Sequence, residues 1–240
     1  MSSVNFAGGL LSVVFALVLA GCSSEKKDVP YGREPALLFP SDHPQVWGIA
    51  PAINLSGESG VDPLIQADLL YQQLQAVKGL TVVPVDRVVA VYQALRIAQI
   101  QSEDQARAVC ESLGLDGLLV PTVTAYDPYN PPKFAAALQL FVPTHTPKAA
   151  SIDARELARE AAPAPGGNEP AHVKFVQVVG MYDAANGSVR DSVLTYAKGR
   201  YNPQSPLASD EYFQNMDRYC GFVYHDLIRK LFGRPQLNAG

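Results

Sequence analysis

Cysteine and histidine are scarce in this sequence. Its 240 residues include three cysteines and four histidines, and none stands at the spacing of a CxxC pair or a zinc site. They are Cys22, Cys110, Cys220, His43, His145, His172 and His225. We therefore predict that the chain holds neither a metal nor a cofactor.

Catalytic motifs are also missing. The sequence has no GxSxG elbow, phosphate-binding glycine loop, HExxH pair or kinase motif. Asp62 precedes a proline and is explained as a helix cap, and Cys110 lies on an apolar helix face with no histidine nearby. His225 and Arg229 stand one helical turn apart, on what we interpret as a solvated face. The sequence predicts a protein that is not an enzyme.

Excess positive charge and long apolar runs are lacking too. The chain has 19 Lys and Arg against 23 Asp and Glu, a net charge of −4 without a basic cluster. Such a balance argues against nucleic-acid binding, which needs a basic surface. After the first 21 residues, no run reaches the roughly 20 apolar residues of a membrane helix.

What is present at the start is a run of apolar and small residues that ends in Leu19-Ala20-Gly21-Cys22. The run is too short for a membrane span and is typical of a signal peptide over residues 1–21. Its last four residues resemble the lipobox of bacterial lipoproteins, in which cleavage precedes the cysteine and the thiol carries a lipid. The alternative is an ordinary signal peptide. We favour lipidation, for example with palmitate, at Cys22.

Residues 22–45 are polar and broken by proline and glycine, so we interpret them as a tether between the membrane and the folded part. A single domain is expected over 46–233, followed by a tail over 234–240. Within that domain, residues 143–171 are rich in Pro, Gly and Ala and are interpreted as a mobile insertion.

The domain alternates between β-prone runs and helical patterns. Strands are expected over 46–53, 80–85, 118–126 and 134–142. Helices are expected to begin after Asp62, Asp86 and Ser102, each of which is a capping residue type. Pro121 falls inside the third strand and predicts a bulge or an edge there. Helical crossovers make the first three strands mostly parallel, so we predict an α/β fold with a mixed sheet and helices packed on it.

Two further patterns concern the end of the chain. Asn186-Gly187 stands between two β-prone runs, 172–182 and 188–197, and favours a hairpin. A helix is expected from about residue 209, with an apolar stripe that is buried against the sheet. The stripe consists of Phe213, Met216, Cys220, Val223, Leu227 and Leu231. Cys110 and Cys220 are both expected inside; the sequence leaves a disulfide open, and we favour free thiols.

Three blocks resemble a superfamily of bacterial lipoproteins. They are WGIAPAINLSGE at 47–58, TVVPVDR at 81–87 and GLLVPTVT at 117–124, where the family often has glycine in place of Pro121. The superfamily includes the curli-secretion lipoprotein CsgG, the penicillin-binding-protein activator LpoB, the exopolysaccharide lipoprotein PelC and the N-terminal domain of TolB. The resemblance implies an anticodon-binding-domain-like α/β sandwich that acts by binding and assembly at the envelope.

Three functional hypotheses follow. The first is a non-enzymatic scaffolding lipoprotein of the outer membrane that faces the periplasm and binds an envelope protein or itself; Ser23 after the cysteine fits outer-membrane retention. The second is an oligomeric secretion-pore component of the curli type, in which residues 134–142 form part of a membrane hairpin. We prefer a core strand for that run. The third is an unrecognised periplasmic hydrolase.

Overall fold

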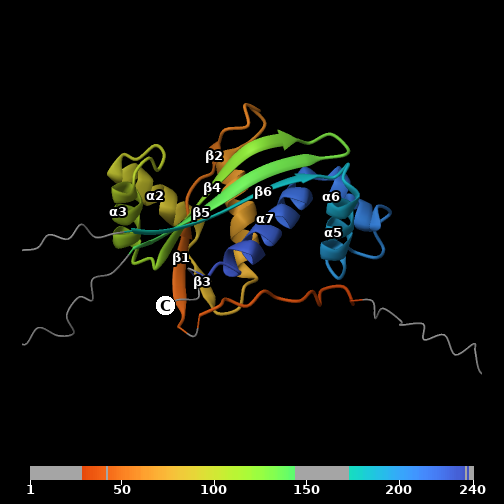
Figure 1. The fold of residues 1–240 in the computed structure, drawn as a ribbon, viewed down its shortest axis with the longest axis horizontal. Coiled ribbons are helices and arrows are strands. Elements are labelled where there is room, and N and C mark those ends of the chain that lie inside the picture. The colour runs from red at the N-terminus through yellow and green to blue at the C-terminus, as the bar shows by residue number, and fades with distance from the viewer. Residues whose placement is uncertain (1–28, 42, 144–172, 236, 238–240) are drawn as a thin grey trace, which may run out of the picture.

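The computed structural model describes residues 29–41, 43–143, 173–235 and 237 (Figure 1). Cys22 and nearly all of the expected insertion lie outside these residues. Within the described residues, no helix is both long enough and apolar enough to cross a membrane.

A six-stranded mixed sheet forms the centre of the fold. Its strands are β1 (Gln45–Ile49), β2 (Ile53–Asn54), β3 (Leu80–Val82), β4 (Gly117–Asp127), β5 (Lys133–Pro143) and β6 (Val173–Asp183). The order is β3-β1-β4-β5-β6, and the short β2 pairs with β4. β3, β1 and β4 run parallel, whereas β4, β5 and β6 are antiparallel. The predicted mixed sheet is confirmed, and 134–142 forms the core strand β5.

Pro121 lies in the middle of β4, opposite an interruption in the neighbouring strand. β1 ends its pairing with β4 at Leu119, and β2 resumes it at Thr122. The Ala50 amide donates to the Leu119 carbonyl, and the Leu55 amide donates to the Val123 carbonyl. Proline has no amide hydrogen to donate, so it fits the gap between these two segments. The bulge in β4 lies further along, between Val123 and Ala125.

One face of the sheet is covered by α1 (Pro63–Gln75) and α7 (Met216–Phe232). The predicted apolar stripe packs here: Cys220, Val223, Leu227 and Leu231 have no exposed surface. The two helices are joined by a buried hydrogen bond, in which the Tyr224 hydroxyl donates to Gln66 Oε1 over 2.9 Å. The stripe starts differently from the prediction, because Phe213 belongs to the separate helix α6 (Glu211–Gln214) and α7 begins after the Asn215 cap.

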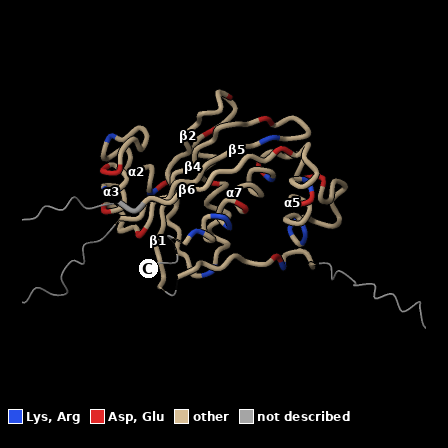
Figure 2. The backbone as a smooth tube through the Cα atoms, in the orientation of Figure 1, with Lys and Arg blue, Asp and Glu red and all other residues tan. Residues whose placement is uncertain are grey.

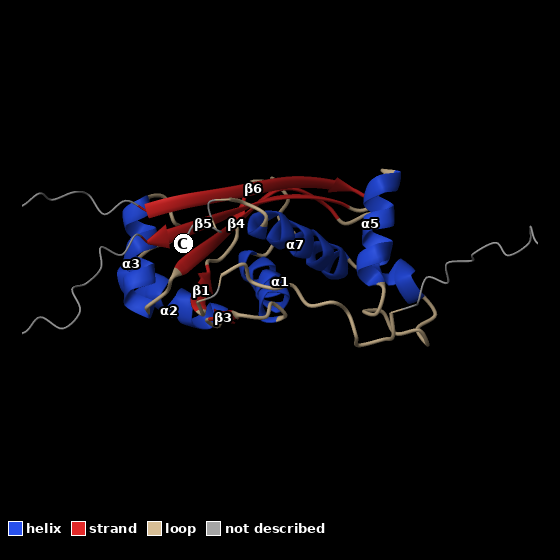
Figure 3. Ribbon diagram, turned by 60° about the horizontal axis from the view of Figure 1, so that its bottom comes forward, coloured by secondary structure: helices blue, strands red, loops and turns tan. Residues whose placement is uncertain are grey.

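The other face is covered at one end only, by α2 (Val85–Leu95) and α3 (Glu103–Leu113) (Figure 3). Leu118, Val120 and Phe141 of the sheet pack there with Cys110 of α3. Cys110 and Cys220 thus belong to different apolar clusters on opposite faces. Both are buried free thiols, as favoured from the sequence.

Two of the three proposed helix caps are confirmed. The Asp62 carboxylate accepts from the amides of Leu64 and Ile65, and the Ser102 hydroxyl accepts from the Gln105 amide. The Asp86 cap was wrong. α2 begins two residues earlier, after Pro84, so Asp86 lies in the first helical turn, where its negative charge interacts favourably with the helix dipole.

The predicted hairpin at Asn186-Gly187 was also wrong. β6 is followed by α5 (Gly187–Ala197), and Asn186 is its N-cap. The Asn186 side-chain oxygen accepts from the Ser188 amide at 2.9 Å. Asparagine serves equally well as a helix cap and as a turn residue, and here the helix is chosen because Val193 and Ala197, four residues apart, are buried together.

Residues 29–41, here called the strap, lie against the domain although the sequence placed them in the tether. The Gly32 amide donates to the Gly199 carbonyl, and the Phe39 amide donates to the Lys78 carbonyl. Phe39 is 5% exposed and packs edge-on against Trp47 and Phe232. Figure 1 shows the strap running from beneath α5 to the edge formed by β1 and β3. The tether can therefore extend no further than residue 28.

Candidate binding surfaces

The half of the sheet that α2 and α3 leave uncovered has an apolar surface, here called the open sheet face. β6 contributes the exposed side chains of Phe175, Val179 and Met181, which are 45%, 62% and 65% exposed. Ala135 and Ala137 of β5 lie beside Met181 and Val179 in the antiparallel register. Charged residues of β4, β5 and β6 stand near the strand ends, so the middle of this face is uncharged (Figure 2).

β6 is also the last strand of the sheet. Its eleven residues pair with β5 along one side, and within the described residues no other strand pairs with it. An edge strand of this length presents a row of backbone donors and acceptors on which another strand can form. The open sheet face and this edge meet along β6.

The turn between β4 and β5 is the Asp-Pro-Tyr-Asn-Pro-Pro stretch at residues 127–132. The Asp127 carboxylate accepts from the Tyr129 amide, a local bond that shapes the turn. Tyr129 is 81% exposed at its tip. This hydrogen bond and the prolines account for the shape of the turn. Tyr129 is an exposed aromatic ring at the end where β4 and β5 are joined.

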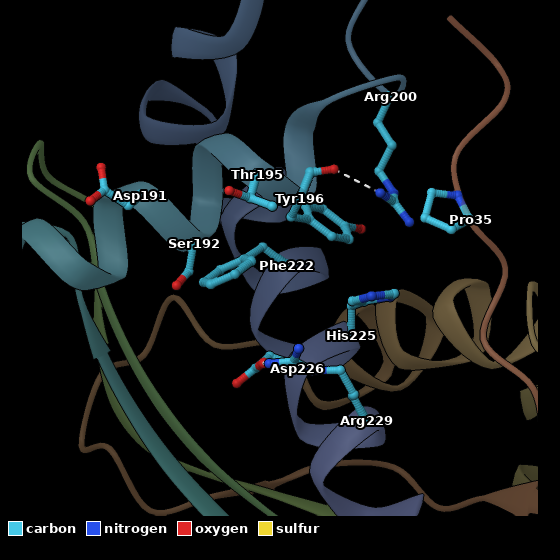
Figure 4. A pocket seen from close by; sticks show the side chains of 10 residues that line it. All are labelled: Pro35, Asp191, Ser192, Thr195, Tyr196, Arg200, Phe222, His225, Asp226 and Arg229. Atoms are coloured by element: carbon cyan, nitrogen blue, oxygen red, sulfur yellow. Dashed lines mark hydrogen bonds and ion pairs between the residues drawn. The ribbon is translucent and has the colours of Figure 1, made fainter. Parts of the chain in front are cut away.

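A groove runs between the strap, α5 and α7 (Figure 4). It has a volume of 290 Å³ and adjoins a second hollow of 570 Å³ beneath the strap. The Tyr196 ring is its centre: the Arg200 guanidinium lies 4.1 Å above that ring, and the His225 ring centroid is 4.9 Å away. The Tyr196 hydroxyl donates to Gln73 Oε1 at 2.8 Å, which ties α5 to α1.

His225 was wrongly placed on a solvated face. It is partly buried against Tyr196, and Figure 4 shows it in the groove beneath Arg200. Burial, followed by the nearby charges of Arg200 and Arg229, lowers the His225 pKa to about 4, although Asp226 opposes this. The imidazole is therefore neutral at neutral pH. Because the sequence pattern of residues 188–197 predicts a strand rather than the helix α5, no aromatic partner for His225 was expected here.

A second polar cluster joins β6 to α7. Asp226 accepts from the Tyr182 hydroxyl at 2.6 Å, from Lys230 Nζ at 3.0 Å and from the Arg229 guanidinium at 2.6 Å. Burial alone would raise the Asp226 pKa, but these hydrogen bonds lower it below its ordinary value. A carboxylate held by three donors is a poor general base, since its proton affinity is reduced. The cluster has the character of a structural link.

The other residues singled out from the sequence are dispersed. Asp62 caps α1, Cys110 and Cys220 are buried on opposite sides of the sheet, and His43 is exposed. Cys22, His145 and His172 lie outside the described residues. In the part of the chain that the structure describes, no three His, Cys, Asp or Glu residues form a group that could hold a metal.

The open sheet face was not expected from the sequence, although a signal for it exists. Residues 175–182 are apolar at most odd and most even positions, the exceptions being Gln177 on the outward row and Gly180 on the inward row, so both faces of that strand carry large apolar side chains. The even positions, including Val176, Val178 and Tyr182, fill the core under α7. The odd positions then have no helix to cover them.

No protein-family model matches the chain, and no curated protein matches it. Several solved structures do. The C-terminal domain of LpoB from Salmonella enterica is 12% identical, with a TM-score of 0.37, and the match covers 59% of this chain and 84% of that domain. Lipoprotein GNA1162 from Neisseria meningitidis is 14% identical, with a TM-score of 0.35, over 63% of this chain and 95% of its own.

The PelC dodecamer from Paraburkholderia phytofirmans matches 83% of this chain and 94% of its own subunit, at 11% identity and a TM-score of 0.35. LpoB and PelC are two of the proteins that the sequence blocks resemble. At TM-scores below 0.5, these similarities assign neither a family nor an activity to this chain.

Proposed function

We propose that this chain is a non-enzymatic envelope lipoprotein that binds a partner protein by accepting an extended segment along β6. In this proposal a lipid on Cys22 anchors it in the outer membrane, and the domain faces the periplasm. The Leu19-Ala20-Gly21-Cys22 pattern supports the anchor. The observation that carries the binding role is the exposed apolar row of Phe175, Val179 and Met181 on an edge strand.

Strand addition fits this surface for two physical reasons. The backbone groups along the outer edge of β6 supply the hydrogen bonds, and the exposed side chains give a segment of alternating apolar residues something to pack against. Exposed apolar side chains that gather on one face of a protein often mark a site of protein–protein contact. The occupant we propose is therefore an extended, partly apolar segment of another envelope protein.

Membrane fractionation tests the anchor. Wild-type protein should sediment with the outer membrane, and Cys22→Ser should leave it soluble or unprocessed, because two or three acyl chains are needed for stable attachment. Ser23→Asp is the matched control: it keeps the cysteine and should move the protein to the inner membrane. Equal membrane retention of Cys22→Ser would refute the lipid anchor.

Photocrosslinking from position 177, between Phe175 and Val179, tests the binding surface in intact envelopes. Val179→Lys should abolish the adduct by placing a charge on the apolar row, whereas Leu64→Lys, on the exposed side of α1, should not. Light scattering of the purified protein should show a monomer. A larger ring that crosslinks to itself would instead favour the secretion-pore hypothesis.

The hydrolase hypothesis has less support. Two clusters of titratable groups, around Asp226 and around His225, are engaged in hydrogen bonds and packing that join β6, α5 and α7. Neither group includes a nucleophile paired with a base.

A further inference from the structure

The strap fixes where the lipid anchor leaves the domain. Its first described residues pack against the C-terminal end of α5: Val29, Pro30 and Tyr31 line a shallow hollow with Lys198, Gly199 and Tyr201. The Gly32 amide donates to the Gly199 carbonyl at 2.8 Å. Gly199 has a φ of 78° and touches Val29 so closely that a Cβ atom would lie 2.7 Å from Val29 Cγ1. This contact is therefore tight and depends on glycine.

The chain between the proposed anchor and this contact is short. From Cys22 to Val29 is 29 − 22 = 7 residue steps. Even fully extended, seven residues span at most about 25 Å. A domain of roughly 190 residues has a radius of gyration near 16 Å and a diameter of about 40 Å. The anchor therefore lies within about 25 Å of Val29, a distance shorter than the diameter of the domain.

The α5 end also differs in chemistry from an ordinary polar surface. Tyr31 is 61% exposed, Leu207 is 43% exposed, and Pro203 is exposed between them in the chain. Arg33 and Lys198 are exposed cations of the strap and the α5 end, where Glu34 and Asp210 are exposed as well. We call Tyr31, Arg33, Lys198, Pro203 and Leu207 the α5-end patch. Tyrosine and leucine beside Arg and Lys suit the boundary between lipid headgroups and acyl chains, where the cations meet anionic headgroups.

We infer that the α5-end patch rests on the headgroups of the bilayer that holds the Cys22 lipid, with α2 and α3 at the distal end. Figures 1 and 3 both show α5 at one end of the long axis and α3 at the other. The inference rests on the proposed lipid anchor. It adds an orientation of the domain on the membrane. The strap lies on the side of the sheet that α1 and α7 cover, opposite the open sheet face (Figure 3). In this orientation the open sheet face stays accessible to a periplasmic partner.

The test uses the chain from Cys22 onward, coupled through that thiol to a maleimide-headgroup lipid. The coupling is selective because Cys110 and Cys220 are 1% and 0% exposed. The vesicles contain phosphatidylethanolamine and phosphatidylglycerol with a headgroup-nitroxide lipid as quencher. A genetically incorporated fluorescent amino acid replaces Gln204, in the loop after α5, or Glu103, in the first turn of α3. Both positions are exposed.

We expect several-fold stronger quenching at position 204 than at 103. Equal quenching at the two positions, or stronger quenching at 103, would overturn the orientation. A Gly/Ser insert of about 30 residues after Lys27 leaves every described residue unchanged and raises the fully extended reach of the tether to about 130 Å, well beyond the domain diameter. It should reduce the difference between the two positions, and an unchanged difference would show that the short tether does not set the orientation.

The vesicle experiment does not depend on lipidation in the cell, because the lipid is attached chemically. Failure of the Cys22→Ser fractionation test would therefore refute the anchor alone. Equal quenching on maleimide vesicles would refute the orientation alone. A double variant, Tyr31→Ser with Leu207→Ser, separates contact from mere proximity: if the patch touches lipid, quenching at 204 should fall.

Discussion

The Tyr182 hydroxyl donates a 2.6 Å hydrogen bond to Asp226 and thereby joins the edge strand β6 to helix α7. The ring reaches this position by lying over Gly180, where a Cβ atom would be only 2.5 Å from Tyr182 Cε2. Lys230 Nζ donates to the same hydroxyl at 2.9 Å. The proposed binding edge is therefore held to the core by a polar link as well as by apolar packing.

Tyr182→Phe should destabilise the protein by roughly 1.5–3 kcal/mol at neutral pH, because the lost hydrogen bond has a charged acceptor. The ring packing against Phe222 is retained. The Asp226 pKa is lowered in the folded state, so its contribution is present above its ordinary pKa of 3.8 and disappears as the pH falls further. The difference between wild type and variant should shrink in acid. Urea unfolding of wild type and variant at neutral pH and at a pH below 3.8 measures this difference. Tyr129→Phe, at an exposed tyrosine, is the control.

Stability should decrease as the pH falls from 6.5 towards 4, in part because of His225. Its pKa is lowered from 6.5 to about 4 in the folded protein, so over that range the unfolded chain binds more protons. Protonation therefore favours unfolding there. His225→Gln should flatten this part of the stability profile, and His43→Gln, at an exposed position, should not. An unchanged slope in His225→Gln would contradict the buried neutral imidazole.

Leu227→Ala should cost roughly 2–5 kcal/mol, as expected when a fully buried leucine is truncated. Leu227 has no exposed surface and lies in the middle of the α7 stripe. Leu95→Ala, at a helical leucine that is 41% exposed, is the matched control and should cost much less. Chemical denaturation measures both. A loss below about 0.5 kcal/mol for Leu227→Ala is typical of surface positions and would place the α7 stripe outside the core.

Gly199→Ala should release the start of the strap while leaving the sheet intact. The substitution places a methyl group against Val29 at a residue with positive φ, so both the contact and the backbone are strained. Limited proteolysis should then cut near residue 30 much faster than in wild type. Gly114→Ala is the control, since Gly114 also has positive φ but no atom lies within 4 Å of its added Cβ. Equal cleavage rates would show that the strap is held elsewhere.

Local sequence signals predicted the parallel part of the sheet well. Strands and helices alternate there, and the helices after Asp62 and Ser102 begin where these capping residues predict. The stripe from Cys220 to Leu231 predicted a buried helix for the same reason: its period of three to four residues leaves one face for the core.

The errors arose where one residue type serves two structures. Asn186 is compatible with a hairpin turn and with a helix cap. The choice depends on what α5 packs against, and those residues are far from Asn186 in the sequence. His225 was misplaced in consequence, because its neighbours Tyr196 and Arg200 come from that helix and its C-terminal end. The strap resembles a tether in its polar, proline-containing sequence, and only one side chain in it, Phe39, is a buried apolar anchor.

The separation of Cys110 and Cys220 into two apolar clusters bears on the cooperativity of the fold. The sheet divides the interior into two compartments, one under α2 and α3 and one under α1 and α7, and each contains a single thiol. If the domain opens as one unit, both thiols become reactive at the same rate; if the α2–α3 layer opens first, Cys110 reacts ahead of Cys220. The two cysteines therefore act as built-in reporters of whether the small layer can detach while the layer that carries the strap and β6 remains folded.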